Sequence, residues 1–445
     1  MTNENIVAIS TSLGASGVAV IRISGSTPLS VAEKMFKPVG KTKVCDFIPN
    51  VMYVGEITCD GFTDFGMCVY FKAPKSFTGE DTVEFHCHGG IAITKGVLKK
   101  ALSCGARLAT NGEFTKRAFM NGKLSLSGAE GLIDMINAES ESGVKAGYYL
   151  YREKLTAEIT ALQDRLTDVL SEIDADMDFP EEDLQVKSTE KARVELTAVK
   201  GKIEKLLSTF HTGRQIKNGV KVGIIGKPNT GKSSLLNAML NYDKAIVSSV
   251  AGTTRDVVEG EININGVKFY FSDTAGIRES DDDIEALGVG LSKKILNESD
   301  LLLFVIDKTN VDKTDEEIES LTAGKRVLTV INKTDIEGDI SHRYDVAVSA
   351  KNKTNVEQLK SMIYDYTVGS GMDVNGDFLC EERHFFALKR ANESLTEALR
   401  NIDLVTLDLL SIDVLDSWSA LGEISGKTAT EEVINNIFAK FCVGK

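Results

Sequence analysis

A glycine-rich segment near the middle of the chain constrains the fold more than any other feature. Residues Gly226–Ser233 read GKPNTGKS, which has the form G-x-x-x-x-G-K-S. The apolar run Val222–Ile225 precedes this segment, and Leu235 and Leu236 follow it, which is the strand-loop-helix setting that the motif requires. Its two glycines allow successive backbone N–H groups to face a phosphate, and the helix that follows adds positive potential. The segment therefore predicts a phosphate-binding loop.

Particular residues of this loop, and of a second loop downstream, have expected roles. Lys232 can reach the β- and γ-phosphate oxygens of a nucleoside triphosphate, and the Ser233 hydroxyl can bind Mg²⁺. Downstream, Asp273-Thr274-Ala275-Gly276 follows an expected strand at 269–271. Asp273 can approach the Mg²⁺ shell, and the Gly276 N–H can meet the γ-phosphate. The residues of the first loop expected to bind the nucleotide are Asn229, Thr230, Gly231, Lys232, Ser233 and Ser234.

Two further loops indicate which base is bound. The apolar run 327–331 leads into Asn332-Lys333-Thr334-Asp335, where the Asp335 carboxylate can accept hydrogen bonds from guanine N1–H and N2–H₂. Adenine cannot offer that pair of donors, so such a carboxylate selects guanine. Ser349-Ala350-Lys351 follows an expected strand at 345–348 and can bring a backbone N–H to guanine O6. These loops follow strand ends, where doubly wound sheets bind ligands, and their order predicts a guanine-nucleotide site.

The two ends of the chain have different periodicities. The N-terminal part contains short apolar strands at 18–21 and 67–71 and a helix at 95–102, which indicates mixed α and β structure. Helical spacing of apolar residues begins at Leu155 and returns over 385–402. The stripe that begins at Leu155 continues through Ile159, Leu162, Leu166, Val169 and Ile173, and a second helix carries Leu196, Val199, Ile203 and Leu206.

These patterns predict a multidomain α/β protein in which one domain interrupts another. We expect an α+β N-terminal domain at 1–122, a helical domain that begins at 123–217, and a mostly parallel, doubly wound α/β domain at 218–368. The final segment, 369–445, is too short for a large core of its own. It should therefore pack on the first helical segment, with the α/β domain inserted between the two. Asp174–Asp183, with six acids and a proline, is interpreted as a solvated linker that ends the first long helix.

Composition restricts the partners and the compartment. The 51 basic and 65 acidic residues leave a net charge of −14, which argues against binding nucleic acid by bulk electrostatics, since that needs clustered Lys and Arg. Seven cysteines without a C-x-x-C pair, no secretory signal and a longest apolar run of only Leu301–Ile306 predict a cytoplasmic protein without a membrane span. His86-Cys87-His88 has no second ligand pair at zinc spacing, so a metal site is not predicted there.

Residues 218–368 resemble a Ras-like GTPase domain, and the whole chain resembles the bacterial tRNA-modifying GTPase family MnmE, also called TrmE. The matching segments are Gly17–Gly25, Phe77–Asp81, Glu84 with His88–Gly90, Gly112–Phe119, Ala251–Asp256 and Phe441–Lys445. In place of the usual family isoleucine, the last segment has Val443. The resemblance implies a homodimer that acts with an FAD-dependent MnmG (GidA)-type partner, as a heterotetramer, on the wobble uridine of tRNA. Given the net charge, tRNA should be bound mainly through that complex.

The resemblance also implies how GTP is cleaved. The position where Ras-like enzymes commonly have a water-orienting glutamine is Ile277, so another group must act on water. The family's catalytic glutamate corresponds to Glu285, although from sequence alone this residue would be one more surface acid. The family's K⁺ ion would take the place of an arginine finger. Its ligands would be Asn229, Ser248, Val250 and Thr253, while Thr254 would close over Mg²⁺; Ser248, Thr253 and Thr254 would also contact GTP.

A one-carbon folate, 5-formyl-tetrahydrofolate or a relative, is the remaining implied cofactor. The matching positions are Arg22, Glu84, Lys123 and Lys445, and Cys442 corresponds to a redox-active or nucleophilic thiol beside it. From sequence alone, Glu84 and Lys123 would be ordinary surface residues and Cys442 a small buried hydrophobe. The alternative function is a ribosome-assembly or regulatory GTPase switch. Such proteins usually append basic RNA-binding domains, whereas this chain appends acidic helices.

Overall fold

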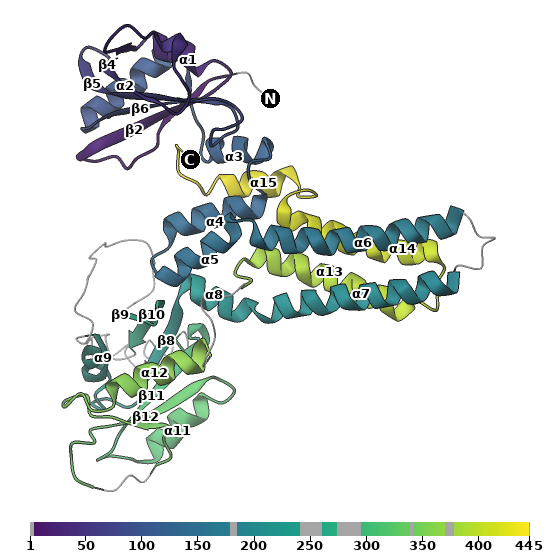
Figure 1. The fold of residues 1–445 in the computed structure, drawn as a ribbon. Helices are drawn as coiled ribbons and strands as arrows, with labels where there is room; N and C mark the ends of the chain where they lie inside the picture. Colours follow the sequence, from purple (N-terminus) through teal and green to yellow (C-terminus); the bar gives the residue numbers. More distant parts are fainter. Residues whose placement is uncertain are drawn as a thin grey trace, which may run out of the picture. The chain divides into compact units, whose positions relative to one another are not determined.

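The computed structural model describes residues 4–178, 185–240, 260–273, 295–338, 342–369 and 378–444. Two compact units, each built from segments far apart in the sequence, make up the chain (Figure 1). The first unit contains Met1–Ile133, Tyr149–Val199 and Glu393–Lys445, and the second contains Asp134–Tyr148 and Lys200–Asn392. Each unit is described by itself below.

The first unit begins with a seven-stranded sheet in the order β3-β4-β5-β6-β2-β1-β7. All neighbours are antiparallel except β1 and β7, which run parallel. Alternate residues such as Ile21, Ile23 and Phe85 are buried among residues of α1 and α2, so one face of the sheet is covered. The strands are β1 (Ile6–Ile9), β2 (Ser16–Gly25), β3 (Phe36–Pro38), β4 (Met52–Thr58), β5 (Thr63–Phe71), β6 (Asp81–Gly89) and β7 (Arg107–Leu108), and the helices are α1 (Pro28–Glu33), η1 (Val44–Asp46) and α2 (Ile91–Ser103).

Helices make up the rest of this unit and continue into the second. The apolar stripe from Leu155 to Ile173 is buried as predicted, and α6 packs along α14 (Figure 1). The expected linker is partly wrong, because α6 continues through Asp178, the last residue described before position 185. The helices are α3 (Glu113–Met120), α4 (Leu126–Asn137), α5 (Glu141–Tyr151), α6 (Lys154–Asp178), α7 (Gln185–Ser208), α13 (Glu382–Asn401), α14 (Leu407–Ser425) and α15 (Glu431–Phe438).

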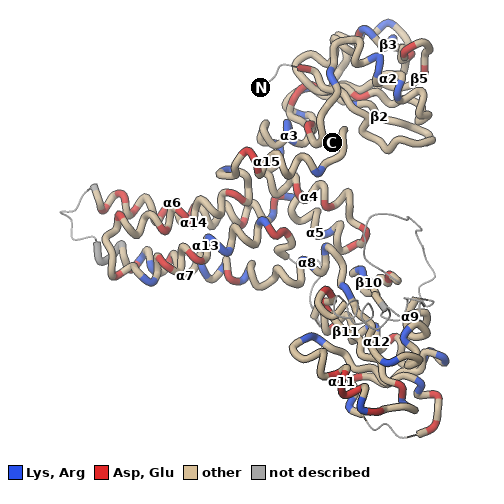
Figure 2. Tube along the Cα trace, turned by 180° about the vertical axis from the view of Figure 1, so that it is seen from behind, with Lys and Arg blue, Asp and Glu red and all other residues tan. Residues whose placement is uncertain are grey.

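Acidic and basic residues are interspersed along α6, α7 and α13 (Figure 2). Two cross-links illustrate the pattern: Arg165 on α6 lies 2.6 Å from Glu195 on α7, and Arg193 lies 2.5 Å from Asp403. Half-exposed pairs of this kind contribute only about 0–1 kcal/mol each. The buried apolar stripes therefore hold these helices together. Among the described residues, no helix has the length and apolar character needed to cross a membrane.

The second unit contains a six-stranded sheet in the order β13-β12-β11-β8-β10-β9. Only β9 is antiparallel to its neighbour. The sheet is doubly wound, and β11 is buried along its whole length, as expected of a strand covered on both faces. The elements are α8 (Phe210–Asn218), β8 (Val220–Ile225), α9 (Lys232–Leu240), β9 (Gly260–Ile264), β10 (Val267–Asp273), β11 (Leu301–Asp307), α11 (Lys313–Leu321), β12 (Val327–Asn332), β13 (Val346–Ala347) and α12 (Val356–Thr367).

Chain order confirms that the α/β domain is inserted between helical segments. Helix α8 leads directly into β8, and after α12 the chain returns to the long helix α13. The predicted multidomain α/β fold class is therefore confirmed, whereas the numerical domain boundaries stay predictions.

Candidate functional site

The carboxyl ends of the parallel strands gather the predicted loops at one edge of the second unit's sheet. Strand β8 leads into the glycine-rich loop, and its neighbour β10 ends at Asp273, which pairs with Ile224. On the other side, β11 ends at Asp307, which pairs with Asn332 at the end of β12. Because parallel strands end at the same edge, segments that are distant in sequence meet there.

Backbone geometry gives the glycine-rich loop its curl. Gly231 has a φ of 92°, and a Cβ at this position would lie 2.3 Å from Asn332 Nδ2. Gly226 has a φ of 144°, and a Cβ there would lie 2.3 Å from the Val305 carbonyl oxygen. Both positions therefore require glycine, for conformation and for space. Asn229, with a φ of 63°, also occupies the left-handed region that asparagine tolerates.

The carbonyls of this loop are held by side chains. Lys232 is buried, and its Nζ donates to the carbonyl oxygens of Gly226 at 3.0 Å and Lys227 at 2.9 Å. Asn332 Nδ2 donates to the Thr230 carbonyl at 2.9 Å. Three carbonyls of the loop therefore accept hydrogen bonds from within the protein, and the Lys232 ammonium is held at the loop itself. Ser233 and Ser234, at the start of α9, are exposed.

The predicted base-binding residues also lie together. Asp335 Oδ1 accepts a 2.6 Å hydrogen bond from Ser349 Oγ, and this bond lowers the pKa of Asp335. The carboxylate is exposed and ionised at neutral pH, as an acceptor for two guanine donors must be. The Ala350 N–H donates to Asn332 Oδ1 at 3.1 Å, so this N–H orients the loop within the protein.

Sequence reasoning missed a connection between these loops at the end of β11. Lys333 Nζ donates to the Asn229 carbonyl at 2.9 Å and pairs with Asp307 Oδ2 at 2.5 Å. Burial would raise the pKa of Asp307, but hydrogen bonds from Lys333 and Thr309 outweigh it and lower the pKa. The only signal in the sequence was that Asp307 ends the apolar run of β11. Its carboxylate joins the base loop to the phosphate loop.

Several predicted residues fall outside the described part of the chain. These are Ser248, Val250, Thr253, Thr254, Gly276, Glu285 and Lys445, and Asp273 is described only as the last residue of β10. Their roles stay predictions. Among the described residues, no group of three or more His, Cys, Asp or Glu side chains is arranged to hold a metal ion.

The predicted folate residues of the first unit include one tight ion pair. Arg22 Nε lies 2.7 Å from Glu84 Oε1, and His86 Nε2 lies 3.5 Å from Glu84 Oε2. Burial alone would raise the pKa of Glu84, but the contacts with His86 and Arg22 lower it. The Arg22 guanidinium also lies over the rings of Phe77 at 5.2 Å and Phe114 at 5.8 Å. Arg22 and Glu84 are directly opposite each other on β2 and β6, on the sheet face opposite α1 and α2, which Phe77 and Phe114 partly cover there.

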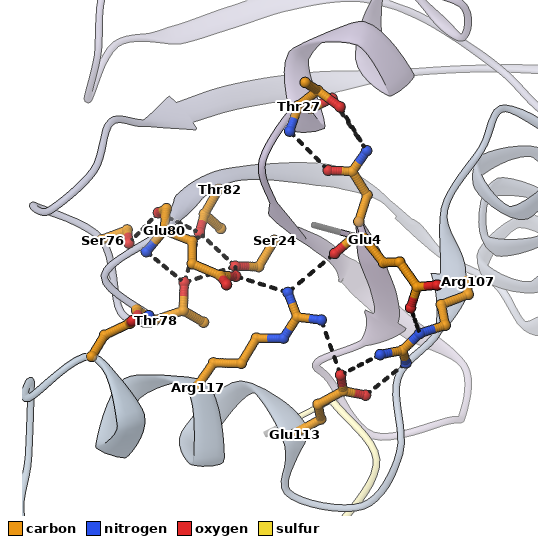
Figure 3. A network of polar contacts seen from close by, with 12 residues as sticks. Glu4, Ser24, Thr27, Ser76, Thr78, Glu80, Thr82, Arg107, Glu113 and Arg117 are labelled. Carbon is orange, nitrogen blue, oxygen red and sulfur yellow. Dashed lines mark hydrogen bonds and ion pairs between the residues drawn. The ribbon is translucent and has the colours of Figure 1, made fainter. Parts of the chain in front are cut away.

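A larger polar network lies beside this pair (Figure 3). Glu113 at the start of α3 accepts hydrogen bonds from both Arg107 and Arg117, at 2.6 Å and 3.0 Å, and these bonds outweigh burial and lower its pKa to about 2. Arg117 also donates to Glu80 at 2.9 Å, and Glu80 accepts from Ser24 at 2.8 Å. The network ties α3 to the sheet, and four of its residues, Glu80, Arg107, Glu113 and Arg117, help to line a cavity of about 370 Å³.

The remaining folate position, Lys123, donates to the Pro74 carbonyl at 3.0 Å. Lys123 lines a second cavity of about 330 Å³ together with Phe77, Tyr151 and Arg152. Phe77 therefore connects the surroundings of Lys123 with those of Arg22. The Arg22 guanidinium lies over the Phe77 ring, whereas Lys123 shares only the second cavity with Phe77.

The C-terminal segment lies against the N-terminal sheet. Asn111 and Val443 form an antiparallel bridge, and Ser10 Oγ donates to the Gly444 carbonyl at 3.2 Å. Cys442 is exposed, so the sequence-only alternative of a buried small hydrophobe is wrong for this residue. The thiol is therefore accessible close to β1, the strand that neighbours Arg22 on β2.

A doubly wound sheet with a glycine-rich loop at the carboxyl ends of its parallel strands is the architecture of a P-loop GTPase. Known proteins specify the family. The family model for the MnmE helical domain matches residues 126–442, and the model for the N-terminus of the GTP-binding protein TrmE matches residues 5–123. The chain belongs to the tRNA modification GTPase MnmE family, and it is a GTP-hydrolysing enzyme.

Three relatives named tRNA modification GTPase MnmE match along their whole length. The protein of Desulforamulus reducens is 37% identical over 461 residues, which cover 100% of both chains. That of Lactobacillus delbrueckii subsp. bulgaricus is 36% identical over 454 residues, with 99% of this chain and 98% of the relative covered. That of Acetivibrio thermocellus is 37% identical over 457 residues, with 99% of each covered.

Proposed function

We propose that this chain is a K⁺-activated GTPase that takes part in carboxymethylaminomethyl-type modification of the wobble uridine of tRNA. The observation that carries the proposal is the gathering of the phosphate loop, Asn332, Asp335 and Ser349 at one sheet edge, in a chain that matches tRNA modification GTPases from end to end. Hydrolysis of GTP would then drive or time a step of the modification.

In hydrolysis, each group of the chain would have a separate task. Lys232 would neutralise charge on the β- and γ-phosphates, and Ser233 with Thr254 would hold Mg²⁺. K⁺, held by Asn229, Ser248, Val250 and Thr253, would supply positive charge beside the β/γ bridge. Glu285 would act on the attacking water indirectly, through another group.

The hydrolysis proposal is tested by GTP turnover in KCl and in NaCl. We expect faster turnover in KCl, and a loss of about 10²-fold or more in Glu285→Gln, the range of removing one group that acts on the nucleophile. Glu316→Gln, an exposed acid at the start of α11, is the matched control. Equal rates in the two salts would reject K⁺ activation, and an unchanged rate in Glu285→Gln would reject the role of Glu285.

For the folate, the Arg22–Glu84 pair supports a recognition site on the sheet face opposite α1 and α2. A carboxylate can accept from the amine edge of a pterin, and basic groups such as Lys123 and Lys445 suit the glutamate tail. Titration with 5-formyl-tetrahydrofolate should give at least tenfold weaker binding in Arg22→Met than in the parent. Lys99→Met, which alters an exposed pair with Asp60, should bind normally. GTP hydrolysis by Arg22→Met reports whether that variant is folded, and normal folate binding by it would refute the assignment.

A homodimer is supported by apolar side chains on the same face of the sheet. Met52 and Val54 on β4 and Phe65 on β5 are 49%, 46% and 54% exposed, and contiguous apolar surface of this kind commonly marks an interface. Light scattering should find a dimer for the parent and a monomer for the double variant Val54→Asp, Phe65→Asp. Leu321→Asp, which changes an apolar residue on α11 that is 68% exposed, should remain dimeric. If the double variant remains dimeric, Val54 and Phe65 do not belong to the dimer interface.

The partner and the tRNA distinguish this proposal from a ribosome-assembly switch. We propose that an FAD-dependent MnmG-type protein forms a heterotetramer with the dimer and provides most contacts with tRNA phosphates. In a deletion strain, nucleoside analysis should find the wobble modification lost while ribosomal subunit profiles stay normal. A normal level of wobble-uridine modification, combined with accumulated ribosomal precursors, would favour the switch. Cytoplasmic location and a reactive role of Cys442 stay predictions.

A further inference from the structure

The second residue of the phosphate loop, Lys227, is held by three oxygens at its far end. Its Nζ lies 2.9 Å from Asp312 Oδ2 and 2.8 Å from Asp315 Oδ2, and it donates to the Asn310 carbonyl at 2.7 Å. The side chain is only 10% exposed. Position x of G-x-x-x-x-G-K-S carries no requirement from the motif itself, so sequence reasoning gave Lys227 no role.

The oxygens that bind Lys227 belong to a rigid turn. Asp312 is the N-cap of α11 and accepts from the Thr314 N–H at 2.8 Å, while Asp315 accepts from the Asp312 N–H at 3.1 Å. This reciprocal capping box satisfies backbone donors that a helix start would otherwise leave free. Asp315 is fully buried. Burial would lower the pKa of Lys227, but Asp315 and Asp312 raise it above its ordinary value, so the ammonium is charged.

The same turn also reaches the base loop. Asp307, five residues before the N-cap, pairs with Lys333, which in turn donates to the Asn229 carbonyl. The segment 307–315 therefore holds the phosphate loop at two points, through Lys227 on one side and through Lys333 on the other. The second of these points is Asn229 itself, whose backbone makes a sharp left-handed turn.

We propose that Lys227 is a positioning residue for nucleotide binding, which fixes the phosphate loop to the capping box of α11. A loop held in its binding conformation loses little further freedom when the nucleotide arrives, and this lowers the entropic cost of binding. Without the ammonium, the buried Asp315 carboxylate would lack its charge partner, and the turn and loop would have to shift to solvate it. The effect should appear in retention of the phosphates and leave base selection, which depends on Asp335, unchanged.

The test measures release of a fluorescent GDP analogue, together with the preference for GTP over xanthosine triphosphate. We expect Lys227→Met to release the analogue about tenfold faster or more, the ratio that corresponds to loss of a charge-assisted contact. Lys227→Arg should restore slow release, since a guanidinium can bind the same carboxylates. Asp312→Asn should give an intermediate rate, because Asp315 remains. Lys325→Met, which removes an exposed lysine that donates to Asn297, should behave like the parent.

Two measurements separate positioning from general instability. They are the release rate well below the unfolding temperature and the preference for GTP over xanthosine triphosphate. A destabilised domain would lower the unfolding temperature without changing the release rate of the fraction that remains folded. Positioning by Lys227 predicts faster release well below the unfolding temperature, with the base preference retained. Parent-like release in Lys227→Met would overturn the proposal, and so would a base preference lost to the same extent as phosphate retention.

Discussion

Asn332 joins the phosphate loop to the base loops through both ends of its amide. Its Nδ2 donates to the Thr230 carbonyl at 2.9 Å, and its Oδ1 accepts from the Ala350 N–H at 3.1 Å. The side chain is 1% exposed, so water cannot replace either bond. One asparagine therefore sets the spacing between the two halves of the nucleotide site.

Replacing Asn332 by aspartate should separate these two functions. The carboxylate of Asn332→Asp can still accept from Ala350, but it cannot donate to Thr230 and would repel that carbonyl. We expect the KM for GTP to rise about tenfold or more, the usual cost of a buried bond replaced by an unsatisfied pair. Steady-state hydrolysis measures the effect, and the exposed Asn297→Asp serves as control. An unchanged KM would contradict the role assigned to Asn332.

A methyl group at Gly231 should abolish nucleotide binding. Its Cβ would lie 2.3 Å from Asn332 Nδ2 in a backbone of φ 92°, whereas Gly324 has a similar φ of 80° and open space around it. Gly324→Ala should therefore cost only the conformational penalty, about 1 kcal/mol of unfolding free energy. Gly231→Ala should also lose binding of GDP, measured by calorimetry. Equal behaviour of the two variants would show that space beside Asn332 is not limiting.

Removing the hydroxyl of Ser349 should make GTP binding more sensitive to acid. The hydrogen bond from Ser349 lowers the pKa of Asp335, so guanine recognition persists until the pH falls through that lowered pKa. In Ser349→Ala the pKa of Asp335 should return toward its ordinary value, and affinity should be lost at a higher pH. Affinity for GDP between about pH 4 and 7 measures the shift, with the exposed Ser361→Ala as control. Coincident pH profiles would disprove the link.

A buried charge cluster in the second unit should make stability depend on pH. Lys217 at the end of α8 lies 2.7 Å from Asp134 and also pairs with Glu381. Burial and the nearby Glu381 charge raise the pKa of Asp134 to about 7. An unfolded aspartate titrates near about 3.9. Between about pH 3.9 and 7, Asp134 is more often protonated in the folded chain than in the unfolded chain. The contribution of Asp134 to the free energy of unfolding therefore falls as the pH rises through this range, and it is constant at higher pH.

The variant Asp134→Asn should remove that slope while keeping an acceptor for Lys217. Between about pH 5 and 7 the parent should lose on the order of 2 kcal/mol more stability than the variant. Urea denaturation at several pH values measures the difference, and comparison with the parent cancels other titrating groups. Glu141→Gln, which alters an exposed pair with Lys145, should keep the parental slope. If Asp134→Asn has the same dependence of stability on pH as the parent, a group other than Asp134 is responsible for it.

Local motifs explain why the nucleotide site could be predicted from sequence. The glycine-rich loop and Asp335 lie within short segments whose chemistry depends on adjacent residues, and buried strands precede them. The contact between Lys227 and Asp315 could not be predicted, because it depends on how β8 and β11 are paired in the sheet. Sequence also favoured a linker where α6 continues, since the acids up to Asp178 suggested solvation.

Contacts between distant segments of the first unit could not be predicted from the sequence either, because they depend on how the strands pair. Arg22 meets Glu84 through the register of β2 with β6, and only family resemblance suggested that the two act together. The exposure of Cys442 likewise follows from the bridge between Val443 and Asn111. A thiol four residues from Phe438 on α15 carries no local signal of that placement.

The bridge at Val443 affects how the protein can be made. Ser10 and Gly444 touch across 434 residues of sequence, so β1 leaves the ribosome long before the segment that packs against it has been translated. At a synthesis rate of about 5–20 residues per second, Ser10 and Asn111 would wait on the order of 20 to 90 seconds for these partners. Strand β1 can pair with β2 and β7 in the meantime, so the sheet can form early, whereas the docking of residues 443 and 444 is a late step of folding.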